Sequence, residues 1–341
     1  MAKAFIKAIS YIFPTTILNN SVLSEKFSNW SEDKIYEKTG IKQRYIAKED
    51  EFASDLAVKA AEKLFTEYSI SPSSIDFIIY CTQSPDYILP TTACILQERL
   101  RLSNHCGAFD INLGCSGYIY GLAVCKGLIQ ASIAKNILFI TSETYSKYIN
   151  PEDKGNRTIF GDAASATLIS GDGIAEILNF DLGTDGSGAN NLIIQDGGTR
   201  SKYGNPSANV GLGDSFNSSS HLYMNGPEIF SFTSKMVPIL VNRVLDNNQI
   251  SKSDVDLYIF HQANKFILDF LRKKINIPIE NFFIHIENCG NTVSSTIPIA
   301  LYEAIALKLC KGNVLLAGFG VGYSWGGVLL NFKKQISSKI D

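Results

Sequence analysis

The sequence predicts an α/β protein that contains parallel strands and consists of two similar halves. Short apolar runs alternate with segments of helical periodicity in both halves of the chain, which is the pattern of strands joined by crossover helices. Three segments of the first half also match segments of the second half at nearly constant spacing. The 341 residues, of which 45% are hydrophobic and 19% charged, suffice for one large or two medium domains with a substantial core.

The first half contains the expected elements in an unbroken order. We interpret the N-terminal segment 1–14 as a first strand, because Lys7 interrupts its apolar run and no signal-peptide cleavage site follows. The alternation continues with strands at 77–81, 109–113 and 137–141 and with helices near 92–101 and 116–131.

The second half repeats this order, with strands at 257–260, 282–286 and 314–317 and helices near 265–275 and 294–309. The stretch 314–332 carries no charge over 19 residues, which is about the length that spans a bilayer. Its five glycines, together with Ser324 and Asn331, favour two buried strands joined by the turn 318–322. We therefore expect no membrane partner and a cytoplasmic location.

The internal repeat is defined by three pairs of segments. IDFIIYCTQ matches VDLYIFHQA at an offset of 180 residues, NILFIT matches NVLLAG at 177, and AFDINLG matches FFIHIEN at about 175. The alternative explanation is that buried strands resemble one another in general. A duplication predicts halves at 1–172 and 173–341, joined through a region rich in Gly, Asn, Asp and Ser at 171–220.

Charge and cysteine content exclude several classes of function. The chain has 31 Lys and Arg against 33 Asp and Glu, so it lacks an overall positive field for nucleic acid or anionic lipid. Its seven cysteines include no CxxC pair and its four histidines are dispersed, which argues against a disulfide framework or a metal site. We expect a small or acylated substrate, no nucleic acid and no metal.

Three polar residues stand at corresponding corners of the two halves. Cys115 follows a strand and opens a helix, where the helix N-terminus is expected to lower the pKa of its thiol. His261 ends a strand in the sequence HQAN, and Asn291 precedes a helix in CGNTVSST. Each alone has a structural interpretation, as a packing cysteine, a structural histidine and a capping asparagine. Their combination predicts a shared site.

A thiol beside two N–H donors suits carbon–carbon bond formation from thioesters. The thiol can accept an acyl group from a thioester, and the two donors can hold the enolate that forms when a malonyl group loses carbon dioxide. A cysteine protease would use the same residue types, but the duplicated architecture argues against that class.

The motifs DINLGCSG, HQAN, GNT and GFGVGYSWGG together resemble 3-oxoacyl-acyl-carrier-protein synthase III, a condensing enzyme of the thiolase superfamily. The similarity covers essentially the whole chain, including TGIKQRYIA, DLGTDGSG and LYMNGPEIF. It implies a thiolase-like fold in which duplicated βαβαβαββ halves form five layers (αβαβα). It also implies a homodimer that uses an acyl thioester and malonyl-acyl carrier protein as substrates, as in fatty acid biosynthesis, and needs no cofactor.

The resemblance implies roles for individual residues. Cys115 would accept the acyl group, and His261 with Asn291 would stabilise the decarboxylated enolate. Asn264 would support this pair, and Phe319 would lie near the nucleophile.

Two further residues would shape the acyl site. Val321 stands where the family has a glycine, and its backbone N–H would complete the oxyanion hole with that of Cys115. The valine side chain must then occupy space that the family leaves empty. Leu89 stands where a bulky family residue reaches across the dimer, and a smaller residue there would suit a longer or branched acyl chain.

The sequence departs from the family at the expected entrance. Lys34 replaces the tryptophan that stacks on the adenine of coenzyme A, and Lys154 replaces the arginine on its other face. Pro227 follows Gly226 in place of an asparagine, and Phe266 replaces an arginine used in carrier-protein docking. These changes predict that two flexible ammonium groups replace a flat stacking pair. They further predict loading from an acyl carrier protein in a specialised pathway.

Two other functions stay open at this point. A thiolase-fold acyltransferase would move an acyl group to a non-malonyl nucleophile without decarboxylation, which the presence of His261 and Asn291 disfavours. A catalytically silent scaffold subunit is disfavoured by the presence of all three reactive residues. A basic group near the entrance either contacts an acidic carrier protein or forms a solvated helix face: Lys265, Arg272, Lys273 and Lys274.

Overall fold

The chain folds around two mixed β-sheets. The computed structural model describes residues 2–202 and 219–332, so residues 203–218 of the expected connecting region and the segment 333–341 lie outside the described residues. The first sheet contains β1 (Phe5–Ile12), β4 (Phe77–Cys81), β5 (Gly107–Ile111), β6 (Asn136–Glu143) and β7 (Ala163–Ser170). The second contains β8 (Ala175–Thr184), β11 (Leu257–Phe260), β12 (Phe282–Phe283), β13 (Gly312–Gly320) and β14 (Ser324–Phe332).

The two sheets have the same strand order. It is β5-β4-β6-β7-β1 in the first and β12-β11-β13-β14-β8 in the second, and a short antiparallel ladder between β1 and β8 connects them. The register also reproduces the sequence repeat, because Phe77 pairs with Ile137 as Leu257 pairs with Val314. Leu257 follows Phe77 by 180 residues and Val314 follows Ile137 by 177.

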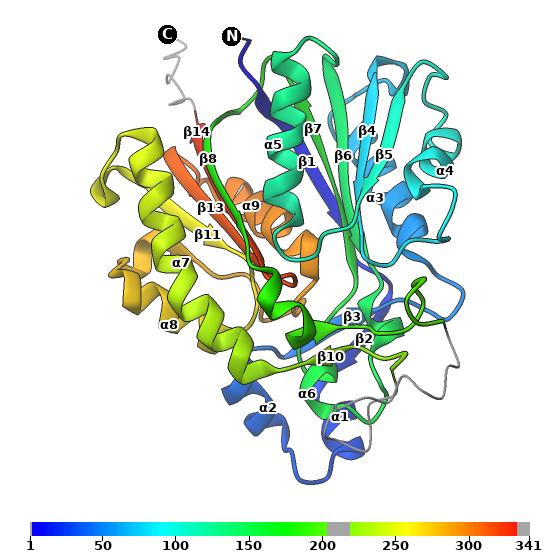
Figure 1. Ribbon diagram of the computed structural model, residues 1–341, viewed down its shortest axis with the longest axis vertical. Helices are drawn as coiled ribbons and strands as arrows, with labels where there is room; N and C mark the ends of the chain where they lie inside the picture. Colours follow the sequence, from blue (N-terminus) through cyan, green and yellow to red (C-terminus); the bar gives the residue numbers. More distant parts are fainter. Residues whose placement is uncertain (1, 203–218, 333–341) are drawn as a thin grey trace, which may run out of the picture.

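Helices cover both sheets and separate them. α3 (Ala53–Glu67) and α4 (Thr92–Arg99) pack on the outer face of the first sheet, and α7 (Gly226–Asn248) and α8 (Lys265–Ile275) on the outer face of the second. α5 (Gly117–Gln130) and α9 (Thr296–Ala306) lie between the sheets and share one core with both (Figure 1). The order of layers is therefore the predicted αβαβα.

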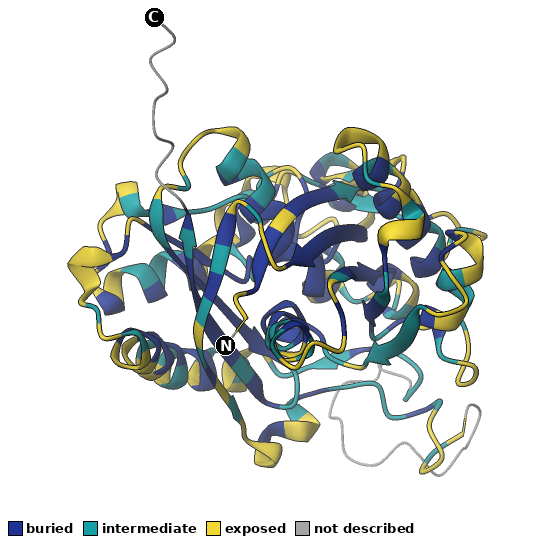
Figure 2. Cartoon of the chain, turned by 90° about the horizontal axis from the view of Figure 1, so that it is seen from above, coloured by how far each residue is buried: buried dark blue, intermediate teal, exposed yellow. Residues whose placement is uncertain are grey.

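The two central helices are apolar on most sides because sheets cover them from both directions. Figure 2 shows the buried strands and the central helix surrounded by exposed outer helices and loops. Gly121 allows α5 to approach β6 closely, since a Cβ atom at this position would overlap the Phe139 ring. Burial of both helices fixes the start of each helix relative to the neighbouring strand ends, which is where the candidate residues lie.

Short elements cover one end of the layers, below the sheets in Figure 1. They comprise β2 (Thr16–Asn19), α1 (Asn20–Lys26), α2 (Glu32–Thr39), β3 (Gln43–Ile46), α6 (Lys154–Arg157), β9 (Leu192–Ile193) and β10 (Tyr223–Met224). Short 3₁₀ helices are η1 (Pro72–Ser74), η2 (Tyr145–Tyr148), η3 (Gly186–Asn191), η5 (Lys252–Asp254), η6 (Ile279–Asn281) and η7 (Val293–Ser295).

Several expected boundaries differ from the structure. The strand expected at 282–286 ends at Phe283, because the next backbone N–H groups leave the ladder and that of His285 donates to Oε1 of Gln262 at 2.7 Å. The helix expected at 294–309 begins as η7 and ends at Ala306. The helices expected near 92–101 and 116–131 end at Arg99 and Gln130, which is within the usual scatter of helix boundaries.

The uncharged stretch 314–332 forms the hairpin of β13 and β14. No helix in the described parts of the chain combines the length and apolar character needed to cross a membrane.

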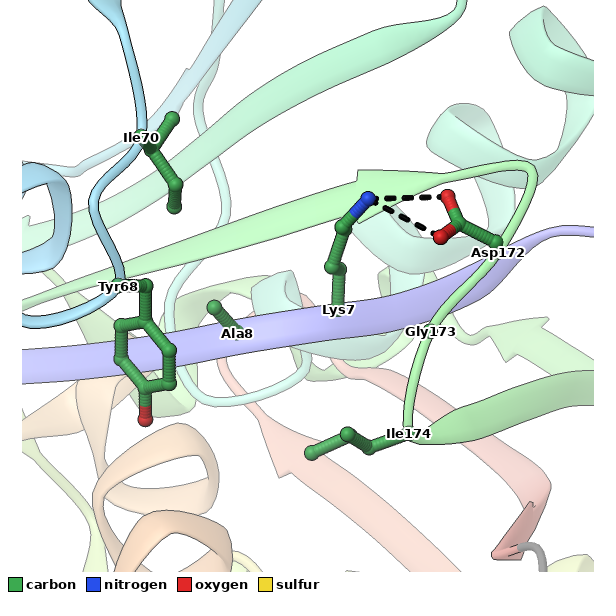
Figure 3. Close-up of a pocket in the computed structure, with 7 residues that line it drawn as sticks. All are labelled: Lys7, Ala8, Tyr68, Ile70, Asp172, Gly173 and Ile174. Atoms are coloured by element: carbon green, nitrogen blue, oxygen red, sulfur yellow. Dashed lines mark hydrogen bonds and ion pairs between the residues drawn. The ribbon is translucent and has the colours of Figure 1, made fainter.

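The β7–β8 turn lies where the two halves meet, beside a cavity of about 400 Å³. Lys7 of β1 forms an ion pair there with Asp172 at 3.0 Å (Figure 3). Gly173 packs against Ile6, since a Cβ atom on this glycine would overlap the carbonyl of Ile6. We propose that this turn is the boundary between the halves 1–172 and 173–341.

Candidate active site

Cys115 lies between the end of β5 and the start of α5 and is 7% exposed. The residues around it leave little free space. A Cβ atom at Gly320 would come within 3.0 Å of its Sγ atom, so only glycine at that position leaves room for the thiol. The thiol therefore sits at a corner formed by the first half and closed by β13 of the second.

Burial and the nearby carboxyl of Glu143 raise the pKa of the Cys115 thiol to about 12. The lowering that we predicted from the helix N-terminus is therefore wrong. The physical reason is desolvation, which penalises a thiolate in an apolar corner more than one helix end stabilises it. The thiol needs a proton acceptor before it can attack.

His261 directly follows β11 and is 2% exposed. Its Nδ1 atom lies 2.7 Å from Oγ1 of Thr296, and its ring packs edge-on against Phe319 with the ring centres 5.8 Å apart. Burial lowers the pKa of the imidazole to about 3, so the ring is neutral at physiological pH.

Asn291 has a fixed side-chain orientation. Its Oδ1 atom accepts a hydrogen bond from the backbone N–H of Val293 at 2.9 Å, which leaves the amide Nδ2 as the group available to a ligand. Two backbone hydrogen bonds fix the Asn291 main chain. Its N–H donates to the carbonyl of Ile159, and its carbonyl accepts from the N–H of Gly161. Gly290 precedes it with φ of +70°, a conformation that favours glycine.

A chain of contacts connects the three residues. Gly320 lies against Cys115, the adjacent Phe319 lies against His261, and Nδ2 of Asn291 is 3.4 Å from the carbonyl oxygen two residues after His261. The structure thus brings Cys115, His261 and Asn291 to one region where the two halves meet, as the repeat predicted.

Sequence reasoning missed Glu143, a fully buried carboxyl group at the end of β6. It accepts hydrogen bonds from the backbone N–H of Gln83 and from the hydroxyls of Thr82, Ser84 and Ser294. Burial nevertheless raises its pKa to about 8. The acidic residue at the end of an otherwise apolar strand was the signal that could have identified it.

Replacing Glu143 by glutamine is expected to flatten the pH dependence of stability. A solvated glutamate in the unfolded chain titrates near ~4.3, so between that pH and about 8 the folded protein holds a proton that the unfolded chain has lost. The free energy of unfolding therefore falls as pH rises through this window, by up to ~1.4 kcal/mol per pH unit. Urea unfolding of both proteins across the window measures the difference, and equal slopes would contradict the prediction.

Val321 and a neighbouring cavity define the space beside Cys115. The Val321 side chain occupies the space above Gly114, because a Cβ atom on Gly114 would lie 3.1 Å from its Cγ1. A cavity of about 670 Å³ opens beyond it. Its wall includes five residues of the apolar cluster that contains Cys115: Tyr145, Leu192, Ile194, Leu222 and Val321. Leu89 is 80% exposed and outside this wall, whereas its neighbour Ile88 lines it.

The expected entrance contains a tryptophan that the sequence comparison missed. Two ammonium groups lie near the Trp30 ring, with Nζ of Lys154 and Nζ of Lys38 each 5.6 Å from the ring centre. The prediction of two flexible ammonium groups at this entrance therefore left out an aromatic ring that lies beside one of them, Lys154. Lys34 instead extends to the backbone carbonyl of Asn29. Trp30 lies four residues before Lys34, the position at which the family has its tryptophan, so a position-by-position comparison missed it.

Two other candidates have mainly local contacts. Asn264 caps α8, since its side chain accepts from the N–H of Ile267 at 2.8 Å. Gly226 begins α7, and a Cβ atom there would meet no atom within 4 Å.

Comparison with known proteins decides the family. Residues 109–186 match the family model described as 3-oxoacyl-[acyl-carrier-protein] synthase III, and residues 245–332 match the model of its C-terminal part. A beta-ketoacyl-[acyl-carrier-protein] synthase III of Clostridium perfringens is 39% identical over 320 residues, which cover 93% of this chain and 95% of the relative. The chain belongs to the synthase III family. It is a condensing enzyme of this acyltransferase type.

Solved synthase III structures have the same fold. A crystal structure of a 3-oxoacyl-(acyl-carrier-protein) synthase III aligns with a TM-score of 0.93 and 44% identity, covering 97% of this chain and all of the other. The synthase from Burkholderia xenovorans aligns with a TM-score of 0.89 and 36% identity over 97% and 94% of the two chains. The predicted family and the thiolase-like fold are confirmed.

Proposed function

We propose that this synthase III transfers an acyl group from a thioester to Cys115 and condenses it with a malonyl-carrier thioester to form a 3-oxoacyl product. The observation that carries the proposal is the junction at which Cys115, His261 and Asn291 meet although they come from three separate elements. A thiol there can hold the acyl group, and His261 with Asn291 can stabilise the enolate. No cofactor takes part in this scheme.

The surroundings of Cys115 support the acyl-transfer half of the reaction. The backbone N–H groups of Cys115 and Val321 would hold the carbonyl oxygen, while Phe319 supports the position of His261. The apolar wall of the 670 Å³ cavity would accept the acyl chain. Because Val321 narrows the cavity beside Gly114, branching close to the carbonyl is disfavoured.

The second substrate enters past α2 and the start of α8. Asn264 supports the HQAN turn there, and Gly226 borders open space at the start of α7. Lys265 and Phe266 are exposed at the start of α8. The other basic residues of this group occupy the last turn of α8, roughly 10 Å or more along the helix axis, so Lys265 is the member of this group nearest the start of α8. We place the malonyl-carrier protein over this start of α8.

A homodimer and a cytoplasmic location complete the proposal. The exposed segment with Tyr87, Ile88 and Leu89 offers apolar surface to a second copy, which would bring Leu89 to the partner's acyl cavity. All seven cysteines are unpaired, which fits a reducing compartment.

The decisive experiment combines mass measurement with product analysis. The protein is incubated with a panel of acyl-coenzyme A and acyl-carrier-protein thioesters, and then with malonyl-carrier protein. We expect a mass gain equal to the acyl group, followed by carbon dioxide release and a 3-oxoacyl product. No mass gain with any donor would refute the covalent mechanism. A mass gain without carbon dioxide release would favour the non-decarboxylating alternative.

Trp30 is expected to bind the planar base of a coenzyme A donor. Replacing Trp30 by alanine removes an aromatic surface flanked by two cations, and contacts of this kind contribute ~1 to 1.5 kcal/mol. We therefore expect KM for an acyl-coenzyme A donor to rise about tenfold with little change in kcat. Steady-state kinetics with Lys34→Ala in parallel separates the two candidates, since a larger effect at Lys34 would contradict this assignment.

A further inference from the structure

Gln83 brings a primary amide into the wall of the 670 Å³ cavity beside Cys115. Its Oε1 atom would lie 2.6 Å from a Cβ atom on Gly114, the residue that precedes Cys115. The same wall includes apolar side chains such as those of Leu192 and Val321. An amide carries two N–H donors and a carbonyl acceptor. Each of these groups therefore needs a partner when an acyl chain displaces water from the cavity.

The carbonyl end of the Gln83 amide already has its partner. The Tyr145 hydroxyl donates to Oε1 of Gln83 at 2.6 Å, and among the described residues it has no other hydrogen-bond partner. Burial, followed by the nearby Glu143 and Cys115, raises the pKa of this hydroxyl, so it keeps its hydrogen. The backbone N–H of Gln83 donates to Glu143 at 3.0 Å. Main chain and side chain of Gln83 are thus both held in one orientation.

The amide nitrogen of Gln83 faces the cavity. In the part of the chain that the structure describes, Nε2 bonds no other atom, and it is not among the buried polar atoms that lack a partner. It therefore borders the open space that Gln83 helps to enclose. In the proposed homodimer the second copy brings Leu89 to this cavity, and an aliphatic side chain cannot accept a hydrogen bond.

We propose that Gln83 is a specificity-determining residue whose Nε2 donates to an oxygen on the acyl chain, so that the preferred acyl group carries a hydroxyl or keto oxygen near its thioester end. The inference rests on the proposed acyl transfer to Cys115 and names the class of its substrate. The oxygen belongs near the thioester because the amide lies against Gly114, next to the nucleophile. An all-carbon chain would instead bury Nε2 without a partner, which is unfavourable.

Other polar groups in the wall fit this role less well. The carboxyl groups of Asp86 and Asp196 accept hydrogen bonds when ionised and donate none, and Asp196 already accepts from two serine hydroxyls at 2.6 Å. Asn112 is also an amide in this wall, but its side chain is exposed and borders a second cavity of about 660 Å³. Asn112 therefore provides the matched control for Gln83.

Paired acyl donors and three variants of the full-length protein test the inference. Hexanoyl-coenzyme A is compared with chains of the same length that carry one oxygen, namely the 3-hydroxy, 4-oxo and 5-oxo derivatives. Intact-protein mass gives the rate of acyl transfer to Cys115 for each donor. Gln83→Met removes the amide from a side chain of about the same length, Tyr145→Phe keeps the amide but removes the group that orients it, and Asn112→Leu removes the control amide.

We expect the native protein to react roughly tenfold faster with the best oxygen-bearing donor than with hexanoyl-coenzyme A. A tenfold ratio corresponds to ~1.4 kcal/mol, which is within the range for a buried donor that lacks a partner. The ratio should fall to about one in Gln83→Met and by a few-fold in Tyr145→Phe. It should stay near the native ratio in Asn112→Leu.

Several results would overturn the inference. The first is a native protein that reacts equally fast with hexanoyl-coenzyme A and with every oxygen-bearing donor. The second is equal slowing of all donors in Gln83→Met, because it would place Nε2 on the thioester carbonyl that they share. The third is loss of the preference in Asn112→Leu to the same extent. The proposed function itself fails separately, if the native protein gains acyl mass from no donor at all.

Discussion

Replacing Cys115 by alanine is expected to abolish formation of the acyl-enzyme and to lower turnover by roughly a thousandfold or more, as for loss of other covalent nucleophiles. The Cys115 thiol lies at the junction of β5, α5 and β13, and a thiol can hold an acyl group as a thioester. Intact-protein mass after incubation with an acyl thioester measures the first effect, and 3-oxoacyl product formation measures the second.

Cys125→Ala provides the matched control, because Cys125 is a fully buried thiol on α5, the helix that Cys115 precedes. We expect this variant to gain the acyl mass at close to the native rate. A Cys115→Ala protein that still gains one acyl group would show that another residue is the nucleophile. Circular dichroism of both variants separates loss of chemistry from loss of fold.

Replacing Asn291 by alanine is expected to separate the two half-reactions. The Nδ2 group of Asn291 is oriented by the N–H of Val293, and we assign it to the enolate rather than to acyl transfer. Removal of one such donor lowers the rate of its step by about a hundred- to a thousandfold. Carbon dioxide release from malonyl-carrier thioester should fall by this amount, while acylation of Cys115 stays within a few-fold of native.

Asn281→Ala serves as the control for loss of an asparagine side chain, since the Asn281 amide also donates to a backbone carbonyl, that of Asp256, outside the candidate site. An equal loss of acylation and decarboxylation in Asn291→Ala would contradict the assignment. It would indicate instead that the Asn291 side chain mainly orders the turn to Val293, whose backbone N–H donates to it.

The sequence predicted most of the fold because its strong signals are local or repeated. Buried parallel strands leave apolar runs such as 77–81 and 257–260, and both were placed with the bounds that the structure has. The predicted end of the strand at 282–286 was wrong because the backbone N–H of His285 donates to the side chain of Gln262 and not to a neighbouring strand. No local sequence pattern indicates this hydrogen bond.

The candidate site was predicted less completely. Cys115, His261 and Asn291 were found because the repeat gave them equivalent positions. Glu143 was missed because its meaning depends on the donors around it. Trp30 was missed because alignment compares positions, whereas a stacking surface needs only a ring at the right place in space.

The sequence by itself determined the family, the order of strands and helices in each half, and the three residues at the junction of the halves. These properties follow from the hydrophobic periodicity and the motifs of the sequence, which are present before the chain folds. Only the tertiary structure decided the protonation of the site. Burial raises the pKa of Cys115 and lowers that of His261, and the hydroxyl of Thr296 faces one nitrogen of the ring. Desolvation and hydrogen-bond direction depend on all neighbouring atoms at once, so they exist only after the two halves have packed together.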